Sequence, residues 1–265
     1  MGGLSVLKAL RAAMPLEDFI YIADSGHAPY GERDEAHVLA RSRAIAQHLV
    51  RQNVKALVIA CNTATAAAIR LLRAEHPGLA LIGVEPALKP AVALSKTGRV
   101  GVMATRSTLA SAKFQALLAA QSGSDTPIEF IVQPCDGLAH AIESSADTGD
   151  ATKVIALCAQ YTGAMGRFGT ETGQIDTLVL GCTHYPFASA HLRALVGPQV
   201  QFTDNGEAVA RQTRRLAQAT LTLTPPGSDQ PPGQISLFTT GQPPMLQAAA
   251  LRWLGLRAAV DTLLF

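Results

Sequence analysis

Two stretches of the chain share an apolar run that ends in a cysteine and continues into polar residues. Residues 57–63 read LVIACNT and residues 178–184 read LVLGCTH, so Cys61 and Cys182 occupy matching positions. Apolar runs can resemble one another by chance, but the shared cysteine and the threonine after it favour an internal repeat. A thiolate is a nucleophile, a base and a metal ligand, which makes these two cysteines the first candidates for chemistry.

Two thiols on opposite sides of one bound molecule could invert a stereocentre that carries an acidic C–H bond. One group removes the proton from one face while the other donates a proton to the opposite face, and the roles exchange between the two enantiomers. The pKa values of the two thiols would then be coupled. Two other interpretations stay open. Each cysteine could be a buried packing residue, or Cys61, Cys182 and His184 could bind a metal, although a fourth ligand at a recognisable spacing is lacking.

Polar residues beside the cysteines are candidate ligands for a substrate carboxylate. Asn62 and Thr63 follow Cys61 just before a predicted helix, whose first N–H groups favour an anion. Thr183 and His184 follow Cys182. His184 could exchange a proton, donate a hydrogen bond to an anion or bind a metal, although a lone histidine is more often structural.

A third candidate site lies in residues 24–31, DSGHAPYG, after another apolar run. The Pro-Tyr-Gly sequence predicts a rigid turn that presents backbone N–H groups and a phenol at Tyr30 and Gly31. Turn composition alone would indicate an ordinary strand-to-helix loop. Its position at the predicted carboxyl end of a strand makes it a candidate.

The elements that must position these residues alternate along the chain. Strands separated by helices and apolar on both faces predict parallel sheets covered on both sides, in which ligands bind beyond the carboxyl ends of the strands. Helices with a 3.6-residue period are predicted at 34–51, 65–75, 107–120, 152–166, 187–196 and 207–219. Strands are predicted at 19–23, 56–60, 80–84, 99–103, 128–132, 177–181, 200–203 and 235–239.

Two breaks in this pattern predict an α/β protein of two domains. Glu85-Pro86 interrupts the alternation after three strands, and Gly197-Pro198 precedes a strand that we expect to return to the first sheet. We therefore predict a first domain of residues 1–85 plus 202–265 and a second domain of residues 86–201. If the two halves fold alike, the strand ends that carry Cys61 and Cys182 can face each other across a cleft.

Composition excludes several classes of function. The chain has 265 residues, 48% hydrophobic and 16% charged, with a formal net charge of +2, which gives no electrostatic case for nucleic acid or an anionic membrane as a partner. No apolar run is long enough to span a membrane, and a signal peptide's layout is lacking. Four cysteines without a C-x-x-C pair indicate a cytoplasmic protein without a disulfide framework. Cys135 and Cys158 have no neighbours suited to catalysis, and we interpret both as packing residues.

Segments spread over nearly the whole chain resemble the glutamate racemases of the aspartate/glutamate racemase superfamily. The two cysteine motifs, at 60–65 and 180–186, are the specific part, because glycine-containing segments alone would be a weak match. The remaining resembling segments are 2–7, 21–24 with 29–31, 83–87, 101–105, 204–208 and 238–241.

The resemblance implies a cofactor-independent enzyme that interconverts L- and D-glutamate and supplies D-glutamate for bacterial peptidoglycan. It implies two pseudo-symmetric α/β domains, each a parallel sheet in a three-layer architecture, with the active site in the cleft between them. Cys61 and Cys182 would be the acid/base thiols, with His184 assisting Cys182. The family uses no pyridoxal phosphate and no metal, and its members include homodimers. The implied substrate-binding residues are Tyr30, Gly31, Asn62, Thr63, Thr183, His184 and Glu143. For Glu143 an alternative stays open, in which it is an exposed glutamate at the end of a helix without a role in binding.

The chain departs from the family at its start. The family has a first strand followed by Asp-Ser-Gly-x-Gly-Gly-Leu-Ser, whose Asp and Ser contact the substrate, whereas here Met1 stands at x before Gly-Gly-Leu-Ser. We expect Met1 to be an internal methionine of a longer protein. Two other functions stay open. One is a related racemase of aspartate or another acidic amino acid. The other is a non-catalytic ligand-binding or regulatory protein on the same scaffold.

Overall fold

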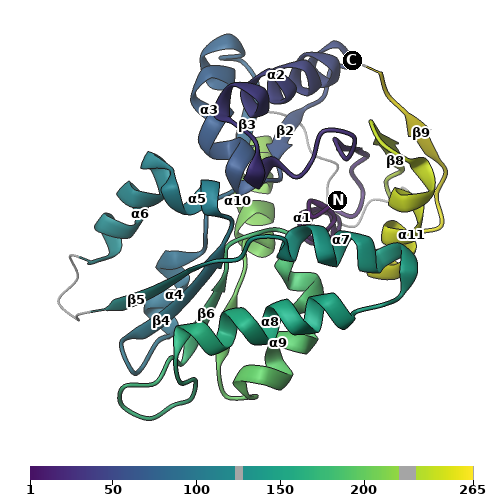
Figure 1. Cartoon of the computed structure of the whole chain (residues 1–265). Helices are drawn as coiled ribbons and strands as arrows, with labels where there is room; N and C mark the ends of the chain where they lie inside the picture. The colour runs from purple at the N-terminus through teal and green to yellow at the C-terminus, as the bar shows by residue number, and fades with distance from the viewer. Residues whose placement is uncertain (123–127, 221–230, 265) are drawn as a thin grey trace. The chain divides into compact units, whose positions relative to one another are not determined.

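The computed structural model describes residues 1–122, 128–220 and 231–264. They form two compact units, one of Met1–Val84 with Gly206–Phe265 and one of Glu85–Asn205. Every strand pairing among the described residues is parallel, and helices connect the strands (Figure 1). The predicted α/β class with parallel sheets is therefore confirmed.

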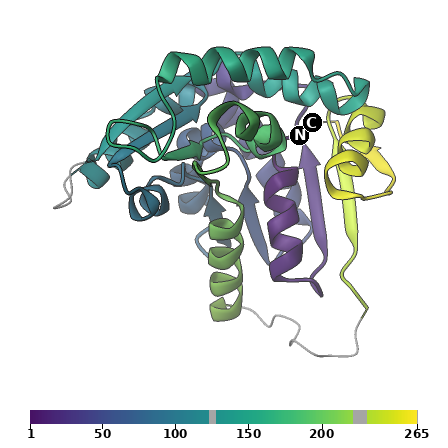
Figure 2. The ribbon, with the colours of Figure 1, turned by 90° about the horizontal axis from the view of Figure 1, so that it is seen from below.

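The first unit contains two parallel sheets, of strand order β1-β8-β9 and β2-β3. Figure 2 shows β1 beside β8, with α1 next to them. The elements of this unit are α1 (Leu4–Ala13), β1 (Phe19–Ala23), the 3-10 turn η1 (Tyr30–Glu32), α2 (Glu35–Arg51), β2 (Ala56–Ile59), α3 (Asn62–Glu75), β3 (Ala80–Gly83), α10 (Gly206–Thr220), β8 (Ile235–Thr239), α11 (Pro243–Leu254) and β9 (Val260–Thr262).

The β2-β3 sheet is covered by helices on both faces. Leu81 of β3 packs in a cluster with Leu72 of α3, while the next residue, Ile82, packs with Leu10 of α1 and Val209 of α10. Successive side chains of a strand point to opposite faces, so the two clusters lie on opposite sides of the sheet. This explains why the strands are apolar throughout rather than alternating.

The second unit holds one parallel sheet of order β5-β4-β6-β7. Val102 of β4 packs with Leu88 and Phe114 on one face. On the other face, a Cβ added to Gly101 would lie 2.7 Å from Met165 Cε of α8, so this helix covers the sheet closely there. The elements are α4 (Leu88–Leu94), β4 (Arg99–Ala104), α5 (Arg106–Ala110), α6 (Ala112–Ser122), β5 (Glu129–Pro134), α7 (Leu138–Thr148), α8 (Thr152–Met165), β6 (Thr177–Leu180), the 3-10 turn η2 (Tyr185–Ala188), α9 (Ser189–Val196) and β7 (Gln201–Thr203).

All eight predicted strands are present with small shifts at their ends, but two expectations were wrong. The strand Gln201–Thr203 does not return to the first sheet, because it pairs with β6 of the second unit. The helix predicted over 107–120 is broken at Ser111, whose ψ of 140° is extended. The Ser111 hydroxyl accepts a hydrogen bond from the Phe114 N–H, and this N-cap starts a new helix.

Candidate active site

Cys61 lies just beyond the carboxyl end of β2 and is the N-cap residue of α3. Its backbone is extended, and its sulfur accepts a hydrogen bond from the Ala64 N–H at 3.5 Å. The helix begins at Asn62 and not near Thr65 as predicted, so Asn62 and Thr63 stand in its first turn, where both are buried. A thiol in this position lies where free backbone N–H groups and the helix dipole stabilise a negative charge.

Two opposing effects act on the Cys61 thiol. Burial raises its pKa, while hydrogen bonds from the backbone N–H groups of Ala64 and Thr63 lower it, and the net shift is upward. The Cys61 thiol therefore tends to hold its proton.

Cys182 lies beyond the carboxyl end of β6 and begins a chain of three polar groups. Its sulfur is 3.7 Å from Nδ1 of His184, and Nε2 of that imidazole is 2.7 Å from Oε2 of Glu143. The side chains of His184 and Glu143 are 17% and 14% exposed. Glu143 lies inside α7, forty-one positions from His184 in the chain, and reaches it because α7 packs against η2. It is not the exposed helix-end glutamate of the alternative interpretation.

The hydrogen bonds of this chain assign the imidazole tautomer. An ionised Glu143 only accepts, so Nε2 of His184 donates to it, and in a neutral imidazole Nδ1 is then an acceptor. Burial lowers the pKa of His184, which favours the neutral ring, although the hydrogen bond to Glu143 and the negative charge of that carboxylate oppose this. The Cys182 thiol thus faces a group that can take its proton, and Glu143 can stabilise the imidazolium that forms.

A glycine sets the position of Cys182. Gly181 donates its N–H to the Met103 carbonyl at 2.7 Å, and a Cβ at Gly181 would lie 2.7 Å from that same oxygen. The strand end can approach β4 this closely only without a side chain. Thr183, the next predicted ligand, is buried.

Tyr30 and Gly31 begin the 3-10 turn η1, which contacts α3 within the first unit. The Tyr30 phenol donates a hydrogen bond to the carboxylate of Asp24, which also binds Arg41 and Thr240. The sequence predicted no role for Arg41 or Thr240, and it marked Asp24 only as the first residue of the candidate segment 24–31. The one signal available was that Asp24 follows directly after the strand Phe19–Ala23.

The remaining cysteines are packed inside the second unit. Cys135 and Cys158 are 2% and 0% exposed. Burial raises the pKa of Cys158 to about 11, so it stays a thiol at neutral pH. Both have the surroundings of packing residues. Among the described residues, no three His, Cys, Asp or Glu side chains are placed to hold a metal ion.

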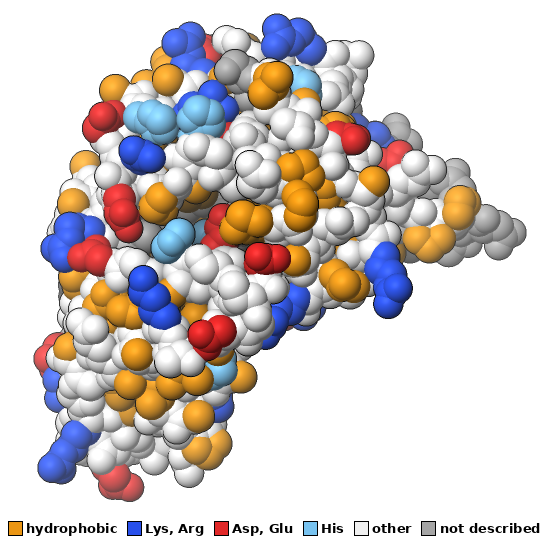
Figure 3. Space-filling model, turned by 45° about the vertical axis from the view of Figure 1, so that its right-hand side comes forward, with side chains coloured by type: hydrophobic (Ala, Val, Ile, Leu, Met, Phe, Trp, Pro, Cys, Tyr) orange, Lys and Arg blue, Asp and Glu red, His pale blue; other side chains and the backbone are white. Residues whose placement is uncertain are grey.

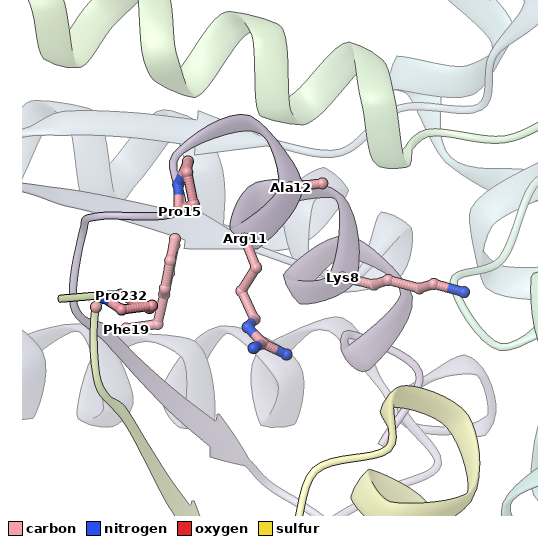
Figure 4. A pocket seen from close by; sticks show the side chains of 7 residues that line it. Lys8, Arg11, Ala12, Pro15, Phe19 and Pro232 are labelled. Carbon is pink, nitrogen blue, oxygen red and sulfur yellow. The ribbon is translucent and has the colours of Figure 1, made fainter. Parts of the chain in front are cut away.

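A cavity of about 290 Å³ opens in the first unit at the opposite end of β1 from Asp24 (Figure 4). It lies beside Phe19, the first residue of the strand, and contains none of the predicted site residues. It is therefore no part of the candidate site. Its lining is Lys8, Arg11, Ala12, Pro15, Phe19, Pro232 and Gly233.

On the face drawn in Figure 3, basic and acidic side chains are interspersed and no basic area dominates. Within the described part of the chain, no helix is long and apolar enough to cross a membrane.

Comparison with known proteins finds proteins named glutamate racemase both by sequence and by structure. The chain is 44% identical to a glutamate racemase of Ectopseudomonas mendocina over 261 residues, which is 98% of this chain and 94% of that protein. It is 43% identical to one of Herpetosiphon aurantiacus, over 92% of this chain and 90% of that protein. Among solved structures, a glutamate racemase isoform of Bacillus anthracis superposes with a TM-score of 0.83 at 29% identity, covering 100% of this chain and 94% of that one.

A second solved structure is the Escherichia coli glutamate racemase in complex with L-glutamate and the activator UDP-MurNAc-Ala. It superposes with a TM-score of 0.82 at 26% identity, covering 99% of this chain and 94% of that one. The family model described as Asp/Glu/hydantoin racemase matches residues 4–213. By sequence over nearly its whole length, the chain belongs to this racemase family.

Proposed function

We propose that this protein is a glutamate racemase that uses Cys61 and Cys182 as its two proton-transfer groups. The observation that carries the proposal is the Cys182–His184–Glu143 chain, in which a thiol at a strand's carboxyl end faces a base held by a carboxylate. Relatives at 43–44% identity that are named glutamate racemases support the choice of substrate.

The reaction inverts the α-carbon of the amino acid through a carbanion-like transition state. In one direction the Cys182 thiolate removes the α-proton and the Cys61 thiol donates its proton to the other face of the same carbon. In the reverse direction the two sulfurs exchange roles, so no proton is gained or lost overall. His184 takes the Cys182 proton through Nδ1, and the helix α3 N-terminus stabilises the Cys61 thiolate.

The substrate carboxylates need hydrogen-bond donors, and the proposed binding residues offer them. Asn62 and Thr63 stand at the N-terminus of α3, and Thr183 precedes His184. Tyr30 and Gly31 belong to the turn that packs on the same helix. The prediction that all these residues face one substrate in a cleft between two domains stays a prediction. So does a cytoplasmic location, in which the four free thiols would persist.

The test is racemisation of L- and D-glutamate followed by circular dichroism, with α-proton exchange followed in D₂O. Wild type should racemise both enantiomers, and Cys61→Ala and Cys182→Ala should each lose at least about a hundred-fold in rate because general acid–base catalysis has that magnitude. Cys158→Ala, which removes a packed thiol, is the matched control and should keep its activity. Full activity in Cys182→Ala would rule out the two-thiol mechanism.

Substrate choice is tested in the same assay with L- and D-aspartate. Aspartate is one methylene shorter, so its distal carboxylate cannot reach the same donors while the α-carbon stays between the sulfurs. We expect glutamate to be preferred, and faster turnover of aspartate would assign the protein to the related activity.

A further inference from the structure

One buried carboxylate in the first unit collects hydrogen bonds from three parts of the chain. Asp24, directly after β1, accepts from Nε of Arg41 at 3.0 Å and from Nη2 at 2.8 Å, the bidentate geometry of an arginine–carboxylate pair. It also accepts from the Tyr30 hydroxyl and, at 2.7 Å, from Thr240. The Asp24 and Arg41 side chains are only 6% and 11% exposed.

The segment that carries Asp24 is itself held in place. The Gly26 N–H donates to the Thr240 hydroxyl at 3.2 Å, and the hydroxyls of Ser25 and Thr239 are 2.7 Å apart. A Cβ at Gly26 would lie 2.5 Å from the Thr240 carbonyl oxygen, so the residues after β1 lie directly against those after β8. Asp24 is therefore anchored to the carboxyl ends of two paired strands.

The hydrogen bond to Asp24 uses the one proton of the Tyr30 phenol. A substrate carboxylate accepts hydrogen bonds and needs donors, and a phenol that donates to Asp24 has no second hydrogen to give. Burial raises the pKa of Tyr30 and the bond to Asp24 raises it further, so the phenol also stays protonated. The Tyr30 side chain therefore donates to Asp24, and a hydrogen bond from residues 30 and 31 to a substrate carboxylate falls to their backbone N–H groups.

A buried ion pair is a weak means of stabilising a fold, because desolvation of the two charges offsets most of their attraction. Its geometry does, however, fix where its partners lie. Here the partner is the tyrosine that opens the turn η1, and that turn contacts the helix capped by Cys61. A negative charge on Cys61 contributes to the raised pKa of Tyr30.

We propose that Asp24 and Arg41 are positioning residues that hold the Tyr30–Glu32 turn against the substrate site. The Tyr30 phenol fixes the position of this turn through its hydrogen bond to Asp24 and does not bind the substrate carboxylate. This inference rests on the proposed function for its ligand, a substrate carboxylate. It does not rest on the two-thiol chemistry.

The kinetic test compares Tyr30→Phe, Asp24→Asn and Arg41→Gln with wild type. Each should raise KM for both glutamate enantiomers about ten-fold, the equivalent of one hydrogen bond to a charged group, with kcat changed by less than about three-fold. Arg41→Lys keeps the charge but cannot form the bidentate pair with Asp24, so its KM should lie between those of wild type and Arg41→Gln. Arg43 lies on the same helix as Arg41 and makes a partly exposed ion pair with Glu75 of α3, so Arg43→Gln is the matched control.

A second readout needs no substrate. Arg33 follows the turn directly and is exposed, so trypsin can cleave there when the turn opens locally. Tyr30→Phe and Asp24→Asn should speed cleavage after Arg33 about ten-fold over wild type, whereas Arg43→Gln should not.

The outcomes separate the two proposals. Unchanged KM and unchanged cleavage in Tyr30→Phe and Asp24→Asn would overturn the positioning role, as would a fall in kcat at constant KM. Wild type without racemase activity would count against the proposed function, and cleavage at Arg33 would then decide the positioning role alone.

Discussion

At the scale of single residues, His184 is the group on which the proposed chemistry of Cys182 depends. Its two ring nitrogens have different partners, with the thiol on Nδ1 and Glu143 on Nε2. The carboxylate therefore decides which nitrogen is left to accept a proton. An amide in its place could present its NH₂ group to the ring and favour the wrong tautomer.

We expect Glu143→Gln to lower kcat/KM for glutamate by about a hundred-fold, the usual size of a lost acid–base contribution. The two enantiomers have equal free energy, so kcat/KM must fall equally in both directions. The separate values of kcat and KM, and the exchange of the α-proton with D₂O, can become unequal between L- and D-glutamate. Glu129→Gln, at an exposed glutamate of the same unit, is the control. Wild-type rates in Glu143→Gln would remove the carboxylate from the mechanism.

Asp24 makes a second residue-scale prediction, for stability against pH. Burial raises its pKa, but the hydrogen bonds from Arg41, Tyr30 and Thr240 lower it more, and the net shift is downward. A carboxyl whose pKa is lower in the folded state contributes stability above its unfolded pKa of about 3.9 and loses that contribution as pH falls through the folded value.

We therefore expect the difference in melting temperature between wild type and Asp24→Asn to be constant above about pH 5 and to shift against wild type below about pH 4. All other carboxyl groups are common to the two proteins and cancel in the comparison. A difference that stays flat down to pH 3 would show that the carboxylate is not stabilised in the folded protein. Thermal scans by circular dichroism measure it.

At the scale of elements, the contact of α3 with β3 sets where Cys61 lies. Thr65 of α3 donates from its hydroxyl to the Ile59 carbonyl at 3.2 Å and accepts from the Val84 N–H at 3.0 Å. Its methyl group would lie 2.5 Å from a Cβ at Gly83. Thr65 thus links α3, the helix capped by Cys61, both to β2 and to Val84 after β3. Its methyl group leaves room only for a glycine at position 83.

Gly83→Ala should lower the free energy of unfolding by about 1–3 kcal/mol, as overpacking of a core does. It should also reduce racemase activity, because α3 must move away from β3. Adding Thr65→Ser removes the methyl group and should restore part of the stability, which a double-mutant cycle in urea measures. Gly78→Ala, where an added Cβ meets nothing within 4 Å, should change stability by less than about 0.5 kcal/mol. Equal effects of the two alanines would contradict this account.

At the scale of the whole molecule, the chain crosses between its two units twice, after Val84 and after Asn205. The binding of glutamate to the whole protein can be measured apart from its turnover. A Cys61→Ser, Cys182→Ser double variant lacks both thiols, so each enantiomer can be added without conversion to the other.

We expect both L- and D-glutamate to raise the melting temperature of this double variant, because a ligand at a hundred-fold excess over Kd stabilises by about 2.7 kcal/mol. For a protein of this size the rise is several degrees. The enantiomers should have similar effects, since the proposed site holds both, and aspartate should have a smaller one. Stabilisation by one enantiomer alone would be inconsistent with a racemase. Sodium chloride at the same ionic strength is the control.

The sequence by itself determined the fold class and the position of both candidate thiols along the chain. Apolar runs between periodic helices are a local pattern, and they predicted the parallel strands that end just before Cys61 and Cys182. Where local hydrogen bonding competes with the pattern, prediction failed, as at the Ser111 cap. The three-residue strand Val260–Thr262 was also missed, because its pairing with β8 is the main feature that marks it as a strand.

Only the tertiary structure decided which polar groups act together within each unit. Glu143 of α7 is hydrogen-bonded to His184, and Asp24 accepts hydrogen bonds from Tyr30, Arg41 and Thr240, which lie in three separate segments. Such contacts depend on how helices pack against the ends of strands, which neither residue spacing nor periodicity encodes. The strand ends could therefore be predicted from local sequence, whereas the hydrogen bonds that tune and position the groups beyond them could not.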